Sequence, residues 1–272
     1  MLCFAANSLL CRLALAPHRI DPATFTTARV FSAAAMLGGI VWMREHRLPR
    51  LAFAKAASVT ALLAYLAFFS FAYTRLSAGT GALILFAAVQ ITMIGVALFE
   101  GERFSPVQWA GLAIAIGGLL YLVLPGVSAP DPLGAVAMAI SGMAWGWFSL
   151  LARGVGEPVE ANAANFLCCL PLVAAVNLVA AGAVHAEPAG LALAAGSGAI
   201  ASGLGYAIWY LALRRLSAAQ AATVQLSVPA IAAFGGAVLL AEPITLRLLF
   251  ASIAMLGGIA IVLTRRAAKR RM

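Results

Sequence analysis

The residues able to take up or release protons are few in this sequence, and they avoid its apolar stretches. Nine Asp and Glu residues and three His residues occur in a chain of 272 residues. All of them stand between the apolar runs or at the ends of those runs. A proton relay through a membrane needs a carboxylate or an imidazole within the apolar span. The sequence therefore offers no such relay, and no buried anion that would hold an organic cation.

The four cysteines give no indication of metal or redox chemistry. Cys3, Cys11, Cys168 and Cys169 show no metal-ligand spacing, and a disulfide between the adjacent pair would be strained. No glycine-rich phosphate loop occurs, so direct use of ATP is not indicated. We therefore expect no enzymatic activity, no cofactor and no bound metal.

The elements that must position the remaining polar residues are long and apolar. Hydrophobic residues make up 64% of the chain and charged residues 10%, and the mean hydropathy is +1.00. A membrane-spanning helix needs about 20 apolar residues. The sequence therefore predicts an all-α integral membrane protein with ten transmembrane helices. The predicted spans are 2–16, 26–43, 53–73, 79–99, 106–124, 133–152, 162–182, 189–213, 219–240 and 246–264.

The first of these runs is short, contains Arg12, and ends in the stretch ALA, which is similar to a signal-peptidase site. A signal peptide would carry a basic stretch before its apolar core, but only Met1 and Leu2 precede this one. We favour a shortened or trimmed helix over a signal peptide.

An internal duplication organises the ten runs. The stretch RLSA occupies 75–78 and returns at 215–218, an offset of 140 that also relates Glu102 to Glu242. An offset of 141 relates two SLL stretches nearer the start of each copy. One copy therefore spans about five helices, and an odd number inverts the second copy in the membrane.

The duplication predicts two inverted five-helix repeats, over 1–126 and 127–272. In secondary transporters of this architecture the substrate site lies near the midplane, between the repeats. The fifth and tenth helices are poor in polar residues and carry stripes of small residues, so we expect them to lie away from the cavity. The glycine pairs at 38–39, 117–118, 235–236 and 257–258 are expected to be close helix contacts.

Basic residues are distributed unequally between the two sides of this arrangement. Thirteen Lys and Arg residues fall in the loops and tail on one side, with Arg12 left inside the first helix. The positive-inside rule makes that side cytoplasmic, with both termini there, in a bacterial inner membrane. The net charge of +9 follows from this bias and does not indicate nucleic-acid binding. The outer side receives Arg19, Arg29, Arg75 and Arg247.

The chain resembles the EamA branch of the drug/metabolite transporter superfamily. The stretch RLSAGTGALILFAAVQITMIGVALFEGERFSPVQWAGLAIAIGGLLYL is similar to the end of one repeat in that family. The second copy fits better, because Pro229 stands 13 residues before Glu242, whereas Val89 occupies the matching position in the first. The stretch FTTARVF resembles the start of the family's second helix, with Arg29 at its recurrent arginine.

This resemblance implies a secondary transporter that exports a small metabolite, such as an amino acid, by alternating access. It does not specify the substrate. A membrane scaffold without transport and a lipid flippase on the same fold are the alternatives. A monomer and a homodimer are both compatible with the sequence, and membrane lipids are the other expected partners.

Polar and aromatic side chains within the spans are the candidates for contact with a substrate, since such groups turn away from lipid. The alternative for any one of them is packing or hydrogen bonding between helices. Amides and rings need no counter-ion, so we expect a neutral or zwitterionic, amino-acid-like solute. The candidates are Asn7, Tyr65, Phe69, Gln90, Trp145, Asn162, Asn165, Tyr206, Trp209 and Gln225.

Five other residues carry narrower expectations. Pro171 and Pro229 are predicted to bend the seventh and ninth helices, either as hinges or as static kinks. Glu242, like Glu102, is expected to cap a helix or form a salt bridge at the membrane surface. Arg29 either meets a substrate carboxylate near the entrance or extends to the lipid headgroups.

Overall fold

Apolar helices form nearly all of the structure. The computed structural model describes residues 1–99, 101, 104–124, 126, 129–152, 155–179, 184–213 and 225–269. Within that part of the chain, the only β-type pairing is an isolated bridge between Ile20 and Ala186. The elements are α1 (Leu2–Leu15), α2 (Pro22–Glu45), η1 (Leu51–Phe53), α3 (Ala56–Tyr73), α4 (Ala78–Phe99), α5 (Pro106–Val123), α6 (Pro132–Leu151), α7 (Pro158–Val179), α8 (Pro188–Gly196), η3 (Ser197–Leu204), α9 (Gly205–Leu213), α11 (Ser227–Leu240) and α12 (Leu246–Lys269).

In the part of the chain that the structure describes, seven helical spans are long and apolar enough to cross a membrane. One of them runs through α8 and η3 into α9, as Pro188–Trp209. The helices α1, α11 and the apolar part of α12, Leu246–Val262, are shorter. The observed bounds agree with the predicted runs to within a few residues. The start of the run predicted over 219–240 lies outside the described residues, and α11 covers the rest of that run. The all-helical membrane architecture is thus confirmed.

The helices begin at sequence signals that compensate for the unpaired N–H groups of a first turn. Asp21 accepts hydrogen bonds from the backbone N–H groups of Ala23 and Thr24, and Pro22 follows it. Asp131 caps α6 in the same way, and Ser105 caps α5 in a capping box. Short polar connections can therefore start each helix sharply next to an apolar run.

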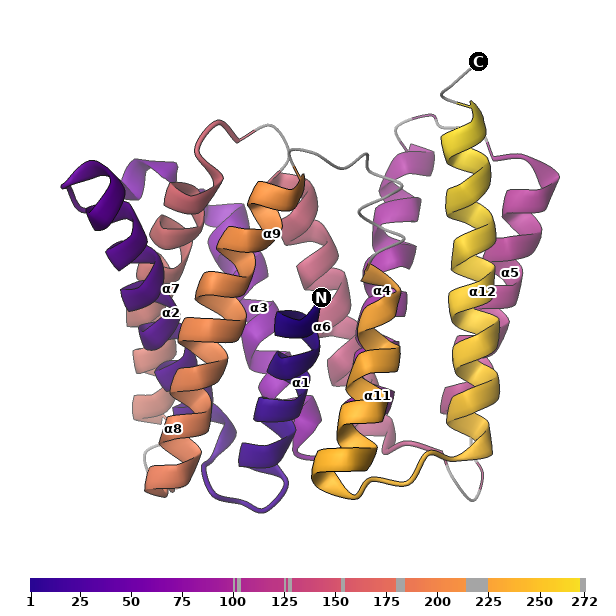
Figure 1. The fold of residues 1–272 in the computed structure, drawn as a ribbon, viewed down its shortest axis with the longest axis horizontal. Coiled ribbons are helices and arrows are strands. Elements are labelled where there is room, and N and C mark those ends of the chain that lie inside the picture. Colours follow the sequence, from indigo (N-terminus) through magenta and orange to yellow (C-terminus); the bar gives the residue numbers. More distant parts are fainter. Residues whose placement is uncertain are drawn as a thin grey trace.

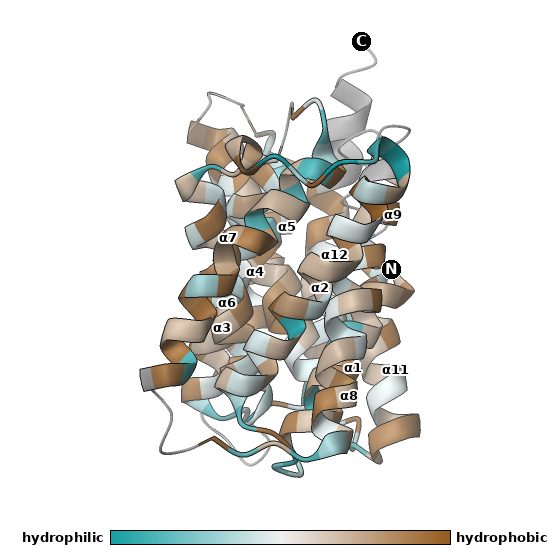
Figure 2. Ribbon diagram, turned by 90° about the vertical axis from the view of Figure 1, so that its left-hand side faces the viewer, coloured by the Kyte–Doolittle hydropathy of each residue, from teal (hydrophilic) through white to brown (hydrophobic). Residues whose placement is uncertain are grey.

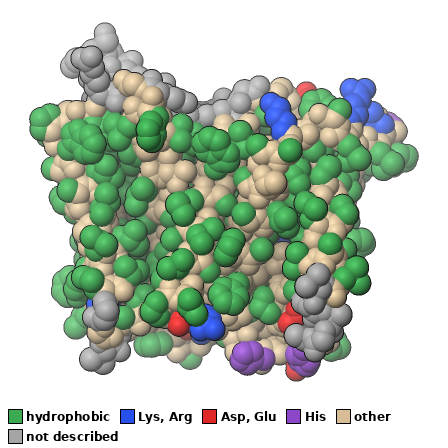
Figure 3. All heavy atoms as spheres, turned by 180° about the vertical axis from the view of Figure 1, so that it is seen from behind, with side chains coloured by type: hydrophobic (Ala, Val, Ile, Leu, Met, Phe, Trp, Pro, Cys, Tyr) green, Lys and Arg blue, Asp and Glu red, His purple; other side chains and the backbone are tan. Residues whose placement is uncertain are grey.

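The outer surface of the helices is apolar, and polar side chains gather at the two ends of the molecule (Figures 2 and 3). Large hydrophobic side chains such as Phe31, Trp42 and Phe234 are more than half exposed. A soluble protein rarely exposes so much contiguous apolar surface. The protein is therefore a multi-pass membrane protein whose apolar band faces lipid.

The helices α5 and α12 pack closely against each other at one flank of the molecule (Figure 1). A side chain at Gly111 would meet the carbonyl oxygen of Gly258 at 2.8 Å, and one at Gly118 would meet Ala254 at 2.8 Å. Small residues let these two backbones approach, as expected. Both helices lie apart from α2 and α7 at the opposite flank (Figure 1).

The close contacts expected of the glycine pairs are present at half of the positions. Gly118, Gly235, Gly236 and Gly258 each have a neighbouring atom within 3 Å of an added side chain. Gly38, Gly39, Gly117 and Gly257 have none within 4 Å, so the expectation was wrong for them.

Pro229 lies in the first turn of α11, where a missing N–H group costs little. Most of the predicted helix before it lies outside the described residues, so the bend at Pro229 stays a prediction.

Candidate functional site

A small cavity lies among α1, α3, α4, α6 and α9. Its volume is about 10 Å³, which is room for one water molecule. We call it the inner chamber. It is lined by Phe4, Asn7, Tyr65, Phe69, Leu85, Phe86, Trp145 and Tyr206.

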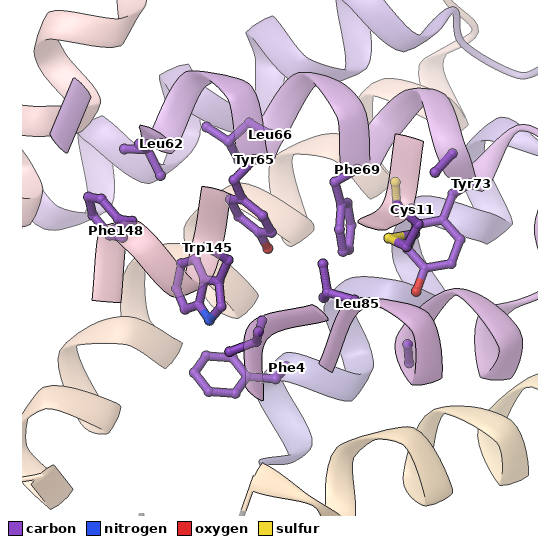
Figure 4. Packing of buried hydrophobic residues seen from close by; sticks show 14 of the residues in the cluster. Phe4, Cys11, Leu62, Tyr65, Leu66, Phe69, Tyr73, Leu85, Trp145 and Phe148 are labelled. Carbon is purple, nitrogen blue, oxygen red and sulfur yellow. The ribbon is translucent and has the colours of Figure 1, made fainter. Parts of the chain in front are cut away.

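Aromatic rings form most of the chamber wall (Figure 4). The ring of Trp145 lies 4.8 Å from that of Tyr65 and 4.9 Å from that of Tyr206, both tilted. Phe4 presents its edge to Trp145 and Tyr206 at 6.1 and 5.9 Å. Such offset and edge contacts are favourable for aromatic pairs. The chamber therefore offers flat apolar faces to whatever enters it.

The hydroxyl group of Tyr65 is the polar centre of the chamber. It accepts hydrogen bonds from Asn7 Nδ2 at 3.3 Å, Arg29 Nη2 at 3.0 Å and the Tyr206 hydroxyl at 3.4 Å. The other amide atom of Asn7, Oδ1, accepts from Ser197 Oγ at 2.6 Å. Side chains from α1, α2 and α9 thus converge on a phenolic oxygen that belongs to α3, and η3 adds a contact to Asn7.

The π-helical stretch η3 supplies two of these polar contacts. A π turn widens the helix locally, and such turns often occur at functional sites. Here it directs Ser197 to Asn7 and Ser202 Oγ to Arg29 Nε at 3.1 Å. Gly198 lies directly against α2, where an added side chain would overlap the carbonyl group of Arg29 and the hydroxyl group of Ser32. Glycine at this position lets α2 and η3 approach closely enough for those contacts.

A larger cavity of about 260 Å³ opens where α3, α6 and α7 meet. We call it the vestibule. Lys55 and Ser58 line it from the start of α3, and Asn162 and Asn165 from α7. The side-chain oxygens of both amides are buried and have no hydrogen-bond partner among the described residues. Phe148 lines the vestibule and packs 5.7 Å from Trp145, so these two rings lie between the vestibule and the inner chamber.

The opposite end of the molecule is closed by an ion pair. Arg12 Nε lies 2.9 Å from Glu242 Oε1, and Arg12 Nη1 donates to the carbonyl oxygen of Tyr73 at 3.1 Å. Glu242 Oε2 accepts from the backbone N–H of Ala78 at 2.8 Å, at the start of α4. Glu242 therefore both caps a helix and forms a salt bridge, as expected of it, whereas Glu102 lies outside the described residues. These contacts join α1, α3, α4 and the segment after α11.

A second ion pair stands beside the vestibule. Arg47 contacts Glu45 and both carboxylate oxygens of Glu160, and the backbone N–H of Arg50 donates to Glu160 at 3.0 Å. The hydrogen bond to Glu160 raises the pKa of Arg47 above its usual value. These contacts fasten the segment between α2 and α3 to the first turn of α7.

The structure brings together five of the ten candidates in the inner chamber. These are Asn7, Tyr65, Phe69, Trp145 and Tyr206. Asn162 and Asn165 belong instead to the vestibule. Trp209 packs edge-on against Phe4 at 5.7 Å. Gln90 and Gln225 are buried, but they line neither cavity.

Sequence reasoning missed the contributions of Ser197, Ser202, Phe4 and Lys55. It gave Arg29 two alternative roles, and the extension to the headgroups is wrong, because the side chain is fully buried. The available signal was an arginine several residues inside an apolar run. The two serines gave no signal, since their role depends on the π turn.

Known proteins resemble this chain over its length. The EamA-like transporter family matches residues 1–124 and again 132–264. This protein belongs to that family. An uncharacterized protein of Pseudomonas aeruginosa is 50% identical over 266 residues, which cover 98% of this chain and 92% of that protein.

A more distant relative carries a functional name. The probable terminal-alkyne amino-acid exporter of Streptantibioticus cattleyicolor is 28% identical over 207 residues, which cover 74% of this chain and 69% of that protein. A crystal structure superposes with a TM-score of 0.67 at 18% identity, covering 100% of this chain and 98% of the other. That likeness concerns the fold alone.

Proposed function

We propose that this family member is a secondary transporter that exports a small, amino-acid-like metabolite by alternating access. The observation that carries the proposal is the polar and aromatic inner chamber. The vestibule opens on one side of it, and the ion pair of Arg12 and Glu242 closes the other side. The exporter name of the Streptantibioticus relative supports the direction of transport and the class of solute.

The proposed architecture is ten membrane crossings in two inverted repeats, over 1–126 and 127–272. Helix packing supports it, because helices that pack together have counterparts, five crossings away in the chain, that also pack together. The helix α3 packs on α6 as α8 and η3 pack on α1, and α4 packs on α6 as α11 packs on α1. The two separate family matches support the same division.

The proposed orientation places the vestibule on the cytoplasmic side of the bacterial inner membrane, with both termini there. The excess of Lys and Arg in the loops at that end supports it. The described form is then open toward the cytoplasm at Lys55 and Ser58 and closed outside at Arg12 and Glu242. Export would proceed when the outer ion pair opens and the vestibule closes.

Flux in proteoliposomes tests the proposal. Vesicles containing the purified protein are loaded with radiolabelled amino acids, and efflux is compared with that of protein-free vesicles. We expect Trp145→Ala to abolish saturable efflux by removing a chamber wall. Trp147→Ala is the matched control, because that side chain, two residues along α6, is 47% exposed while Trp145 is 6% exposed.

The rival functions predict different results in the same vesicles. A scaffold moves no solute above the protein-free rate. A flippase moves fluorescent phospholipids between leaflets and is insensitive to Trp145→Ala. Either result would contradict the proposal.

A further inference from the structure

Arg29 is a fully buried cation in the membrane interior. It lies on α2, and its exposed fraction is 0%. Its guanidinium carbon lies 4.9 Å from the ring centre of Phe69 and 5.4 Å from that of Tyr65. Both rings line the inner chamber, so the charge stands directly behind the chamber wall.

Among the described residues, no carboxylate neutralises this charge. The described acidic residues that form ion pairs do so with other bases, as Glu242 does with Arg12 and Asp131 with Arg75. Arg29 donates only to two hydroxyl groups, of Ser202 and Tyr65, and its Nη1 has no hydrogen-bond partner in the described structure. An unpaired charge is costly in such an environment, and an ionisable residue within a membrane span usually serves function.

The contacts of Tyr65 indicate what could neutralise it. Asn7 Nδ2 and Arg29 Nη2 both donate to its single phenolic oxygen, and Arg29 Nη1 has no partner in the described structure. A hydroxyl oxygen has two lone pairs, whereas a carboxylate has two oxygens with about four acceptor sites. The cluster therefore has more donors than its own acceptor can satisfy, which suits an anion.

We propose that Arg29 and Asn7 bind the carboxylate group of the transported solute in place of the Tyr65 hydroxyl. This inference rests on the proposed transport function and names its specificity-determining residue. Because the chamber holds only about 10 Å³, a solute must displace a lining side chain. Tyr65 is the side chain whose hydroxyl group accepts the hydrogen bonds from Arg29 and Asn7. The vestibule is consistent with this chemistry, since Lys55 is the one charged residue among the described residues that line it.

The test compares solutes that differ only in the carboxylate. Binding of each proteinogenic amino acid to the purified full chain is measured by calorimetry beside its amide and its N-acetyl derivative. We expect acids and N-acetyl acids to bind, and amides to bind about tenfold or more weakly. Equal affinity of acid and amide across the whole set, or no binding by either, would overturn the inference whatever the variants do.

Three variants locate the effect. Arg29→Gln is expected to remove the preference for acid over amide, while Arg29→Lys retains part of it because the charge remains. Tyr65→Phe keeps the ring but removes the competing hydroxyl, so it should bind acids at least as tightly as the unaltered protein. If Arg29 only stabilised the fold, Arg29→Gln would instead weaken the binding of acid and amide equally. That equal loss, or loss of acid binding in Tyr65→Phe, would contradict the inference.

The outcomes separate this inference from the proposed function. If the protein carries amides as readily as acids through vesicles, transport stands and carboxylate recognition by Arg29 fails. If no solute moves, the transport proposal itself fails. Arg75→Gln, at an exposed arginine outside both cavities, is the control for a general effect of losing one positive charge.

Discussion

The two ends of the molecule are built differently. At the end where α1 and α11 finish, Arg12 and Glu242 join four segments through an ion pair and hydrogen bonds to backbone groups. At the other end a cavity of about 260 Å³ reaches toward Phe148 and Trp145, with two buried amide oxygens left unpaired. Satisfied polar contacts hold helices together, and unsatisfied ones mark where solutes or water can enter. The difference supports a form open at one end only.

Filling the open end should have the largest effect. Ser58→Trp places an indole in the vestibule, and we expect saturable efflux to fall by more than tenfold while the melting temperature changes little. Ala57→Trp is the control, because Ala57 is exposed on the neighbouring face of α3. Equal efflux from the Ser58→Trp protein and the control would show that solutes do not pass through the vestibule.

Breaking the closed end should have the next largest effect. Glu242→Gln leaves Arg12 without its counter-ion, and we expect a loss of about 1–3 kcal/mol from the contacts that close this end. Cys11 is fully buried beside Arg12, so its labelling rate by an impermeant maleimide should rise in a chain whose other cysteines are replaced by serine.

The double variant Arg12→Met with Glu242→Gln is the control for this change. Removing both charges avoids an unpaired ion, so it should destabilise this end less than Glu242→Gln alone. Unchanged labelling of Cys11 in the single variant would mean that the ion pair does not hold this end closed.

A smaller effect is expected from the cap of α2, also at the closed end. Burial raises the pKa of Asp21, but hydrogen bonds from Thr24, His185 and Ala23 lower it by more, so the net pKa is below its usual value. The cap therefore contributes stability above about pH 4 and loses it as the pH falls through the lowered pKa. Asp21→Ala should cost about 1 kcal/mol.

The measurement is the melting temperature of the detergent-solubilised protein as a function of pH. The acid-side decrease should be smaller in Asp21→Ala than in the unaltered chain, because the group responsible is gone. Identical pH profiles for the two proteins would rule out this contribution of Asp21.

A pH gradient should have no effect on accumulation. Among the described residues, neither cavity is lined by an acidic residue or a histidine, so that part of the chain places no carboxylate to exchange a proton between the two ends. We expect an imposed gradient to leave the steady-state distribution of a transported acid unchanged after correction for its own ionisation. Uphill accumulation driven by the gradient would reveal a titrating group in the transport path.

The sequence predicted the elements of this protein better than their contacts. Composition and run length located the helices, because the polar backbone groups of a chain in lipid must pair with each other, which leaves few alternatives to a helix. Residue type and position within the spans also selected Tyr65, Trp145 and Tyr206, which do meet in one chamber. It failed for Gln90 and Gln225, because an amide that lines neither cavity has the same local pattern as one that does.

What the sequence determined by itself was an apolar, helical, duplicated chain with its acidic residues at the ends of the apolar runs or between them, since these follow from residue type and spacing alone. Only the tertiary structure decided that Arg29 is buried behind Tyr65 and Phe69. It also decided that Glu242 reaches Arg12, 230 residues away in the chain. The physical reason is that a side chain's partners come from other helices, and the rotation of each helix about its axis is set by packing, which no local pattern specifies.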